Sequence, residues 1–356
     1  MRILIICSSL EKGRDGVGDY SLKLGKWLDR NGCSVAIIAV NDKYISKNQL
    51  SGEVSVRLSS SLSSKSRFEL LQNKINEFEP EILFLQYVPY AYHKKGMPLN
   101  FAKRIGSLST SGEWVIMVHE PYIGGRLTAK GKFVKFAQQK ALRRLVKKTA
   151  PRRVFTSIKK YEKALADINI VSSILPLFGN IAFAETPEKE AGDKVLGVFF
   201  GTHPKKEYFS LVKEGIEKAA SSHLLSIALC GKTGNSEFYA YLKYSFRNKN
   251  IELQNIGELS EKNMSDLFSQ SDFGIARISP DLIGKSGSAI SLLEHGLKLW
   301  IPLAKTQGEI SEEVLFRPDL CYSDLNELLA DKSEAERISN LDKVGKLLLS
   351  QINLIS

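Results

Sequence analysis

The 356-residue sequence lacks the long hydrophobic runs that mark membrane and secreted proteins. Its apolar stretches stay well below the roughly 20 residues that a membrane-spanning helix needs. The N-terminal segment 1–7 is too short in its apolar part for a signal peptide, and it leads directly into a glycine-rich loop. We therefore expect a cytoplasmic protein.

Cysteine is scarce, and its spacing fits neither a metal site nor a redox motif. The four cysteines are Cys7, Cys33, Cys230 and Cys321. Three of them lie in or beside strand-like segments, so we interpret them as small core residues in a reducing compartment. The histidines show no ligand spacing either, and we predict no metal site.

Two well-known phosphate-binding patterns are also missing. A Walker loop requires a glycine five positions before the glycine of its Gly-Lys-Ser, and this chain has Ser279 there. The dinucleotide-binding pattern G-x-G-x-x-G is absent from the first predicted strand-to-helix turn. Both absences argue against an NTPase and against a dehydrogenase.

Acidic residues are missing from one long segment. The chain carries a formal net charge of +11, and residues 126–160 hold thirteen Lys and Arg residues with no Asp or Glu. The positive charge of this block is larger than the net charge of the whole chain, so positive and negative charges nearly balance in the remaining residues. A basic patch of this size indicates an anionic partner.

Within this block, residues 133–148 follow the period of a helix. Phe133, Phe136, Ala137, Ala141 and Leu145 are predicted to share one broad face. Three interpretations stay open: a solvated helix on a sheet, a helix that binds an anionic membrane, and a nucleic-acid contact, for which no motif is present. The candidate contacts with an acceptor or membrane in this helix are Lys140, Arg143, Arg144 and Lys147.

Strand-like apolar runs alternate with helical patterns through most of the chain, which is typical of doubly wound parallel sheets. The expected strands are 2–7, 34–40, 81–86, 114–119, 153–157, 195–200, 225–230, 251–255, 273–276 and 299–303. The expected helices are 20–30, 65–78, 99–109, 133–148, 208–220, 238–247, 261–270, 289–296 and 333–354.

A polar, turn-rich segment at 180–193 separates the two series of strands. The fold class is therefore α/β, with a Rossmann-like N-terminal domain over 1–179, a linker over 180–193 and a Rossmann-like C-terminal domain over 194–332. We expect the C-terminal helix, within 333–356, to pack back on the first domain.

The most informative positive feature is the run Gly284-Lys285-Ser286-Gly287-Ser288 before an apolar stretch. It is typical of a tight turn that opens a helix, where backbone N–H groups and the helix dipole attract phosphate. Lys285 adds positive charge, and the two serines add hydroxyl donors. Glu294 follows two turns later, where it can accept hydrogen bonds from two ribose hydroxyls. The alternative is an ordinary serine-capped helix.

The loop after the first strand contains Gly16 and Gly18. Glycine lets backbone N–H groups approach an anion without a Cβ clash, so both are candidate contacts with a diphosphate. A flexible loop is the alternative interpretation. Asp19 could cap the following helix.

Further candidates follow other strands, because open α/β sheets bind ligands at the carboxyl ends of their strands. His119 could hold a sugar hydroxyl near the reacting carbon, and Glu120 could contact the acceptor or the sugar. Tyr87 and Tyr90 belong to an aromatic loop that could brace an acceptor, although core packing explains them equally well.

Lysines after two C-terminal strands could neutralise a leaving diphosphate. Lys206 is preferred after the strand that ends near Gly201, and Gly231 and Lys232 occupy the equivalent place after the next strand. A surface lysine is the alternative for each.

Four segments in order along the chain carry a family resemblance: 15–20 (Asp-Gly-Val-Gly-Asp-Tyr), 117–122 (Met-Val-His-Glu-Pro-Tyr), 200–206 (Phe-Gly-Thr-His-Pro-Lys-Lys) and 256–260 (Ile-Gly-Glu-Leu-Ser). They resemble, respectively, the glycine-rich loop, the His-containing strand end, the phosphate-binding first strand of the C-domain and the nucleotide-contacting loop of family 4 glycosyltransferases. The resemblance implies the GT-B fold, with two Rossmann-like domains facing a cleft. It adds Thr202, Glu258 and Leu259 to the candidate donor contacts.

The chain departs from the family pattern at two places. The family has two glutamates separated by seven residues; Glu294 matches the second, but Ser286 stands eight positions before it. An arginine commonly follows the glycine of the first C-domain strand in the family, and this chain has Thr202 there. Both changes affect contacts with the phosphates and the sugar of the donor.

The resemblance implies a retaining glycosyltransferase that needs no metal or other cofactor. Its co-substrate is a UDP-, GDP- or ADP-sugar held mainly by the C-terminal domain, and its acceptor is held mainly by the N-terminal domain. The basic block fits a lipid-linked acceptor in polysaccharide or glycolipid assembly and peripheral attachment to the inner membrane face; nucleic acid is the less favoured partner. Two alternatives are a catalytically weak nucleotide-sugar-binding subunit and a GT-B nucleotide-sugar epimerase.

Overall fold

The computed structural model describes residues 1–51, 55–125, 127–185, 189, 192–202, 204, 206–231, 237–305 and 317–353. The chain divides into two units. Unit 1 consists of Met1–Leu175 and Leu341–Ser356, and unit 2 of Pro176–Asn340. The segment 180–193 belongs to unit 2, and residues 186–188, 190 and 191 of it lie outside the described part.

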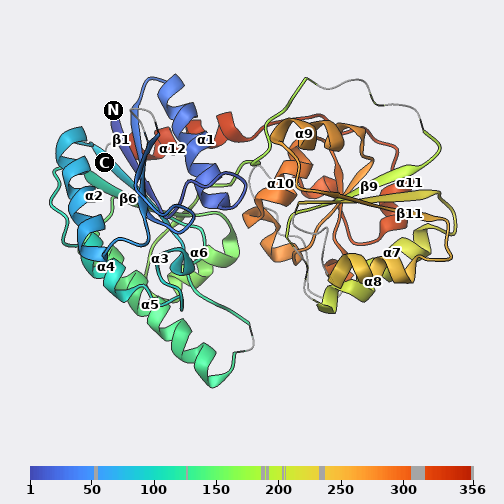
Figure 1. Ribbon diagram of the computed structural model, residues 1–356, viewed down its shortest axis with the longest axis horizontal. Coiled ribbons are helices and arrows are strands. Elements are labelled where there is room, and N and C mark those ends of the chain that lie inside the picture. The colour runs from blue at the N-terminus through green and yellow to red at the C-terminus, as the bar shows by residue number, and fades with distance from the viewer. Residues whose placement is uncertain are drawn as a thin grey trace. The chain divides into compact units, whose positions relative to one another are not determined.

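Unit 1 is built on an eight-stranded sheet with the order β3-β4-β2-β1-β5-β6-β7-β8 (Figure 1). The strands are β1 Arg2–Cys7, β2 Ser34–Asp42, β3 Gln49–Ser51, β4 Ser55–Ser59, β5 Ile82–Tyr87, β6 Glu113–Val118, β7 Arg153–Thr156 and β8 Ser173–Ile174. β3 runs antiparallel to β4, and the other neighbouring pairs of this sheet in the described residues are parallel. The order reverses between β1 and β5, so ligands are expected at the carboxyl ends of these strands.

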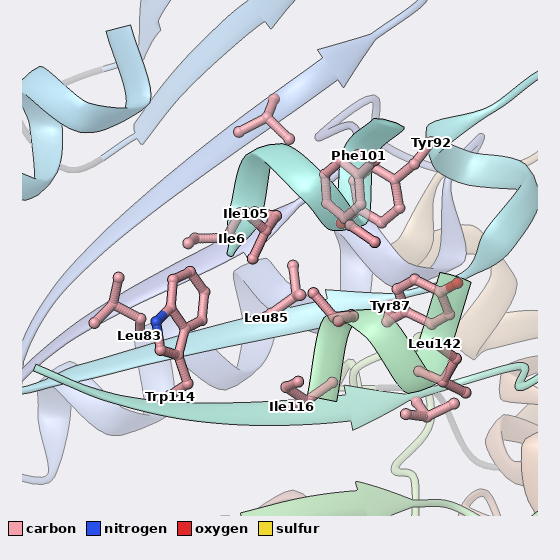
Figure 2. Close-up of a cluster of buried hydrophobic side chains, with 14 of the residues drawn as sticks. Ile6, Leu83, Leu85, Tyr87, Tyr92, Phe101, Ile105, Trp114, Ile116 and Leu142 are labelled. Carbon is pink, nitrogen blue, oxygen red and sulfur yellow. The ribbon is translucent and has the colours of Figure 1, made fainter. Parts of the chain in front are cut away.

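Helices cover both faces of this sheet. They are α1 Gly16–Arg30, α2 Ser64–Phe78, α3 Pro89–Tyr92, α4 Leu99–Ile105, α5 Ala129–Thr149, α6 Lys159–Ala166 and α12 Leu341–Asn353. α2, α4 and α5 share one apolar core with β5 and β6, in which Leu83, Leu85, Trp114 and Ile116 are almost fully buried (Figure 2). This core fixes the two strands whose ends carry the candidate residues of unit 1.

α12 returns to unit 1 and lies beside α1 (Figure 1). A Cβ on Gly345 would lie 2.3 Å from the ring of Trp27, so glycine allows the two helices to approach closely. The predicted C-terminal helix therefore exists, but it begins at Leu341 and not at residue 333.

Unit 2 contains a six-stranded parallel sheet with the order β11-β10-β9-β12-β13-β14. The strands are β9 Val195–Phe200, β10 Leu225–Cys230, β11 Ile251–Gly257, β12 Phe273–Ile275, β13 Lys298–Trp300 and β14 Cys321–Tyr322. The helices are α7 Phe209–Ala219, α8 Glu237–Ser245, α9 Glu261–Gln270, α10 Gly287–Glu294 and α11 Leu325–Ala330.

One core of unit 2 joins α7, α8 and α11 to the sheet, and the other joins α9 and α10 to its opposite face (Figure 1). The strand order reverses between β9 and β12. The predicted α/β class with two doubly wound, largely parallel sheets is confirmed.

Candidate functional site

Three neighbouring strands of unit 2 each end in a glycine at the carboxyl edge of the sheet. Gly201 follows β9, Gly231 follows β10 and Gly257 ends β11, with φ angles of 129°, 86° and 73°. The Gly231 N–H donates to the Gly257 carbonyl oxygen at 2.7 Å. A Cβ on Gly231 would lie 2.9 Å from the Gly201 carbonyl oxygen, so these two strand ends approach through their backbones and leave no room for a side chain at residue 231.

Helix α10 begins at this edge, at the Gly-Lys-Ser-Gly-Ser turn. A 3-10 turn, Pro280–Lys285, leads into it, and Ser286 caps the helix by accepting a hydrogen bond from the Ala289 N–H at 3.3 Å. The Ser286 and Ser288 hydroxyls lie 3.1 Å apart. The Ser288 oxygen would lie 3.6 Å from a Cβ on Gly201. The positive end of the α10 dipole therefore lies near the switch point of the sheet.

Arg277 reaches the same place from the end of β12. Its Nε atom would lie 3.0 Å from a Cβ on Gly201. That nitrogen is buried and has no hydrogen-bond partner among the described residues. Burial lowers the pKa of the Arg277 guanidinium, and Tyr208 opposes this shift. The sequence does not single out Arg277, because its spacing resembles that of any arginine after a strand.

The other described donor candidates of unit 2 have less enclosed side chains. Lys206 is 78% exposed, and its Nζ lies 3.0 Å from Glu237 Oε2, so the structure gives this ammonium a surface ion pair. Thr202 and Glu258 are exposed, and Leu259 is half-buried against the core. Lys232 lies outside the described residues.

Glu294 has a structural partner that its sequence position does not suggest. Its side chain is only 4% exposed, and Oε1 accepts a hydrogen bond from the Asn340 N–H at 2.9 Å. Oε2 would lie 2.6 Å from a Cβ on Gly179. The carboxylate thus contacts both ends of unit 2, near the points where the chain enters and leaves it.

We expect Glu294→Ala to lower the free energy of unfolding by about 1–3 kcal/mol, because the Asn340 N–H loses its acceptor in a buried setting. Glu294→Gln is the matched control: its amide oxygen still accepts this bond, so most of the stability should return. Thermal unfolding of the two variants measures the difference. A Glu294→Ala protein as stable as the wild type would contradict this assignment.

In unit 1, Asp15 caps the helix that follows the first strand. Its Oδ1 accepts hydrogen bonds from the Val17 and Gly18 N–H groups at 3.1 and 3.0 Å. Asp19 instead accepts from the Gly13 N–H. A Cβ on Gly18 would lie 2.3 Å from the Ser9 carbonyl oxygen, so close packing explains this glycine. Gly16 is exposed at the start of α1.

A buried ion pair stabilises the loop that follows β1. Asp42, whose side chain is fully buried, accepts a hydrogen bond from Arg57 at 2.8 Å and another from the Leu10 N–H at 3.1 Å. Arg57 also pairs with Glu11 at 2.6 Å. Burial opposes ionisation of Asp42, but Arg57 and two backbone N–H groups outweigh it and hold the pKa of the carboxyl below its ordinary value.

His119 follows β6 at the carboxyl edge of unit 1 and is 8% exposed. Its Nε2 lies 2.9 Å from Gln86 Oε1. With the Gln86 amide in this orientation, its oxygen accepts, so Nε2 donates the proton and Nδ1 is left as an acceptor. Burial lowers the pKa of His119 to about 3, so the ring is neutral at physiological pH. The Tyr20 ring packs against it at a centroid distance of 5.3 Å.

The structure corrects the interpretation of Tyr87. This side chain is 0% exposed and lies in the core, where its ring stacks with Tyr92 (Figure 2). It therefore cannot touch an acceptor directly. Tyr90 is 48% exposed, and Glu120 is half-buried beside His119 in the sequence.

The residues of the predicted apolar face of the basic helix differ in burial along the helix. Ala137, Ala141 and Leu145 are buried, but Phe133 and Phe136 are 63% and 56% exposed. The basic residues exposed on α5 are Lys130, Lys132, Lys140, Arg143, Arg144, Lys147 and Lys148. α4 packs on α5, while the beginning of α5 extends beyond it (Figure 1). Two phenylalanines and a row of cations therefore share the outer surface of this helix.

Two negative findings apply to the described residues. They contain no group of three or more His, Cys, Asp or Glu side chains arranged to hold a metal ion. None of their helices is both long enough and apolar enough to cross a membrane.

Comparison with solved structures identifies the fold. The chain is similar to sucrose-phosphate synthase from Thermosynechococcus elongatus, with a TM-score of 0.61 and 11% identity over 98% of this chain and 94% of that one. It is similar to an alpha-glucosyltransferase in complex with UDP-glucose and DNA containing an abasic site, with a TM-score of 0.54 and 14% identity over 98% and 90% of the chains.

A third similar structure is a protein from Listeria monocytogenes described as a UDP-N-acetylglucosamine 2-epimerase, with a TM-score of 0.55 and 10% identity over 99% and 95% of the chains. No protein-family model and no curated protein sequence matches the chain. The chain therefore has the GT-B fold of nucleotide-sugar enzymes, with two Rossmann-like units. At these identities the likeness extends to the fold alone.

Proposed function

We propose that this protein is a glycosyltransferase that transfers a sugar from a nucleotide-sugar to an acceptor. The observation that carries the proposal is the edge of unit 2, where glycine strand ends, the capped start of α10 and the Arg277 guanidinium with its buried Nε meet. Backbone amides, a helix N-terminus and an arginine are the groups that bind phosphate oxygens. The fold agrees, because one similar structure is an alpha-glucosyltransferase in complex with UDP-glucose.

In this proposal unit 2 holds the donor and unit 1 holds the acceptor. The diphosphate lies at Lys285–Ser288 and at the strand ends Gly201 and Gly231. These groups stabilise the negative charge that develops on the leaving diphosphate, which is the task that a metal performs in other transferases. His119, as a neutral acceptor at Nδ1, holds a hydroxyl of the transferred sugar.

The family 4 resemblance is the ground for proposing retention of configuration, with displacement on the face of the leaving phosphate. This proposal does not depend on which sugar or nucleobase the donor carries.

The test is turnover of defined donors. The purified protein is incubated with UDP-, GDP- and ADP-sugars, with and without cell-envelope lipid extracts, and release of nucleoside diphosphate is measured. Release from one donor class, increased by the extract that contains the acceptor, is the expected result. Binding of a donor without any turnover would favour a nucleotide-sugar-binding subunit instead.

An epimerase is the second candidate, because one structure of the same fold is described as a UDP-N-acetylglucosamine 2-epimerase. Product analysis separates the two. An epimerase changes the donor sugar in the absence of acceptor, whereas a transferase returns it unchanged or hydrolysed.

We further propose that α5 attaches the protein to an anionic membrane that carries a lipid-linked acceptor. Exposed Phe133 and Phe136 can insert at the lipid boundary while the cations meet headgroups. Each basic residue near such a surface contributes about 1 kcal/mol, so several together give reversible, salt-sensitive attachment.

Replacement of Lys140, Arg143, Arg144 and Lys147 by Gln should release the protein from vesicles that contain phosphatidylserine. Co-sedimentation at low and physiological salt measures this. The control removes the same charge elsewhere on unit 1, by replacing the exposed lysines Lys12, Lys26, Lys47 and Lys65 with Gln. An equal loss of vesicle binding in the two variants would contradict a membrane site on α5. Binding of the wild-type protein to DNA in preference to vesicles would also contradict it.

A further inference from the structure

Arg277 is a half-buried cation whose Nε atom has no partner among the described residues of this chain. Its Nε is fully buried without a hydrogen-bond partner, and no described carboxylate forms an ion pair with the guanidinium. Arginine keeps its charge even where burial lowers its pKa. A buried N–H donor without an acceptor is destabilising unless a ligand or a partner supplies one. An uncompensated guanidinium therefore points to an anion that binds beside it.

The groups around Arg277 indicate which anion fits. Gly201 leaves open the space next to Nε, where a Cβ would lie only 3.0 Å away, and the Ser288 hydroxyl would lie 3.6 Å from the same Cβ. Tyr208 is 2% exposed, and its hydroxyl also has no hydrogen-bond partner in the described part of the chain. Tyr208 and Arg277 lie close enough to affect each other's pKa values.

Four segments thus converge on one position: the end of β9, the turn that contains Tyr208, the end of β12 and the start of α10. They offer a planar cation, two hydroxyls and the positive end of a helix dipole, which is a donor set for phosphate oxygens. One unpartnered buried hydroxyl and one unpartnered buried N–H are consistent with a site whose ligand supplies the missing acceptors.

We propose that Arg277 holds the diphosphate of the donor and thereby supplies the charge that Thr202 cannot supply after β9. The side chain enters from a different strand, β12, and reaches the same switch point from the neighbouring side. It acts with Ser288 and Tyr208, and Lys206 remains in its surface pair with Glu237. The inference rests on the proposed function, because it assigns the donor's diphosphate to this position.

The experiment titrates UDP, GDP, ADP and pyrophosphate into wild type, Arg277→Gln, Arg277→Lys and Arg247→Gln by calorimetry. Arg247 is the matched control, an exposed arginine of the same unit. We expect the preferred nucleoside diphosphate to bind about tenfold to hundredfold more weakly to Arg277→Gln. The affinity of Arg277→Lys should lie between those of the wild type and Arg277→Gln, because lysine keeps the positive charge but not the planar guanidinium with its paired donors. Arg247→Gln should bind as the wild type does.

The melting temperature without ligand separates binding from folding. Arg277→Gln should melt no lower than the wild type, because the Nε–H that it removes has no acceptor in the unliganded protein. Unchanged diphosphate affinity in Arg277→Gln, or a lower melting temperature that accounts for the lost binding, would overturn the inference. If no nucleoside diphosphate binds the wild type, the proposed function fails; Arg277-dependent binding of pyrophosphate would then still support the anion site, and no binding of either would overturn both.

Discussion

His119→Ala is expected to lower the turnover number for sugar transfer by about 10²–10³-fold while nucleoside diphosphate affinity stays unchanged. This range is typical for removal of one preorganised hydrogen-bonding group that acts on the reacting substrate. His119 belongs to unit 1, whereas the diphosphate contacts belong to unit 2. Steady-state kinetics and a parallel nucleotide titration measure the two quantities on the same preparation.

The pH profile provides a second readout of the same residue. Because burial lowers the pKa of His119 to about 3, turnover should show no titration of this ring between pH 5 and 9. Gln86→Glu places a carboxylate at 2.9 Å from Nε2 and should raise the pKa of His119 toward this range, so an acidic limb should appear in the profile.

His223→Ala is the control for histidine removal, because His223 precedes β10 at the opposite, amino edge of the unit 2 sheet. It should retain full turnover. Full turnover per folded molecule in His119→Ala, together with a large fall in melting temperature, would assign His119 to the core.

Asp42→Ala is expected to destabilise unit 1 by about 3–5 kcal/mol, the usual cost of breaking a buried ion pair from one side. Asp42 accepts hydrogen bonds from Arg57 and from the Leu10 and Tyr44 N–H groups, and all three lose their acceptor. Urea unfolding measures the effect. Glu69→Ala is the control, because Glu69 forms only an exposed pair with Lys65 and should change stability by less than about 0.5 kcal/mol.

The sign of the pH effect follows from the lowered pKa of Asp42. Its contribution to stability is fully present above the unfolded-state value of about 3.9 and disappears as the pH falls through the lower folded-state pKa. The stability difference between wild type and Asp42→Asn should therefore shrink below about pH 4. A difference that grows on acidification would contradict the ion-pair assignment.

The buried strands could be predicted from the sequence because each is an apolar run between turn residues. The predicted segments 2–7, 195–200 and 225–230 coincide with β1, β9 and β10. The short strands β3 and β8 could not, because three or two partly polar residues carry no period. Their pairing depends on a neighbouring strand that the local sequence does not reveal.

The sequence could predict which residues lie at strand ends, but it could not predict which residues their side chains contact. The pattern after each strand placed His119 and Gly231 at carboxyl edges, since parallel strands end together. It could not show that Tyr87 turns into the core or that Glu294 is held by Asn340.

Helical periodicity likewise predicts which residues share one face of a helix, but not whether another element packs against that face. Phe133 and Phe136 have the right period for burial, yet α5 begins beyond the helix that packs on it. Arg277 is the clearest case, because only the tertiary structure shows a guanidinium that lacks a carboxylate.

The central claim is that the switch point of unit 2 binds the diphosphate of a nucleotide-sugar. The most direct test is calorimetric titration of the wild-type protein with UDP, GDP and ADP, each compared with its own nucleoside. The account predicts that one nucleoside diphosphate binds with micromolar affinity and that its nucleoside binds at least about a hundredfold more weakly, since the phosphate contacts supply most of the binding energy. Equal affinity for nucleoside and diphosphate, or no binding of any of the three, would contradict it.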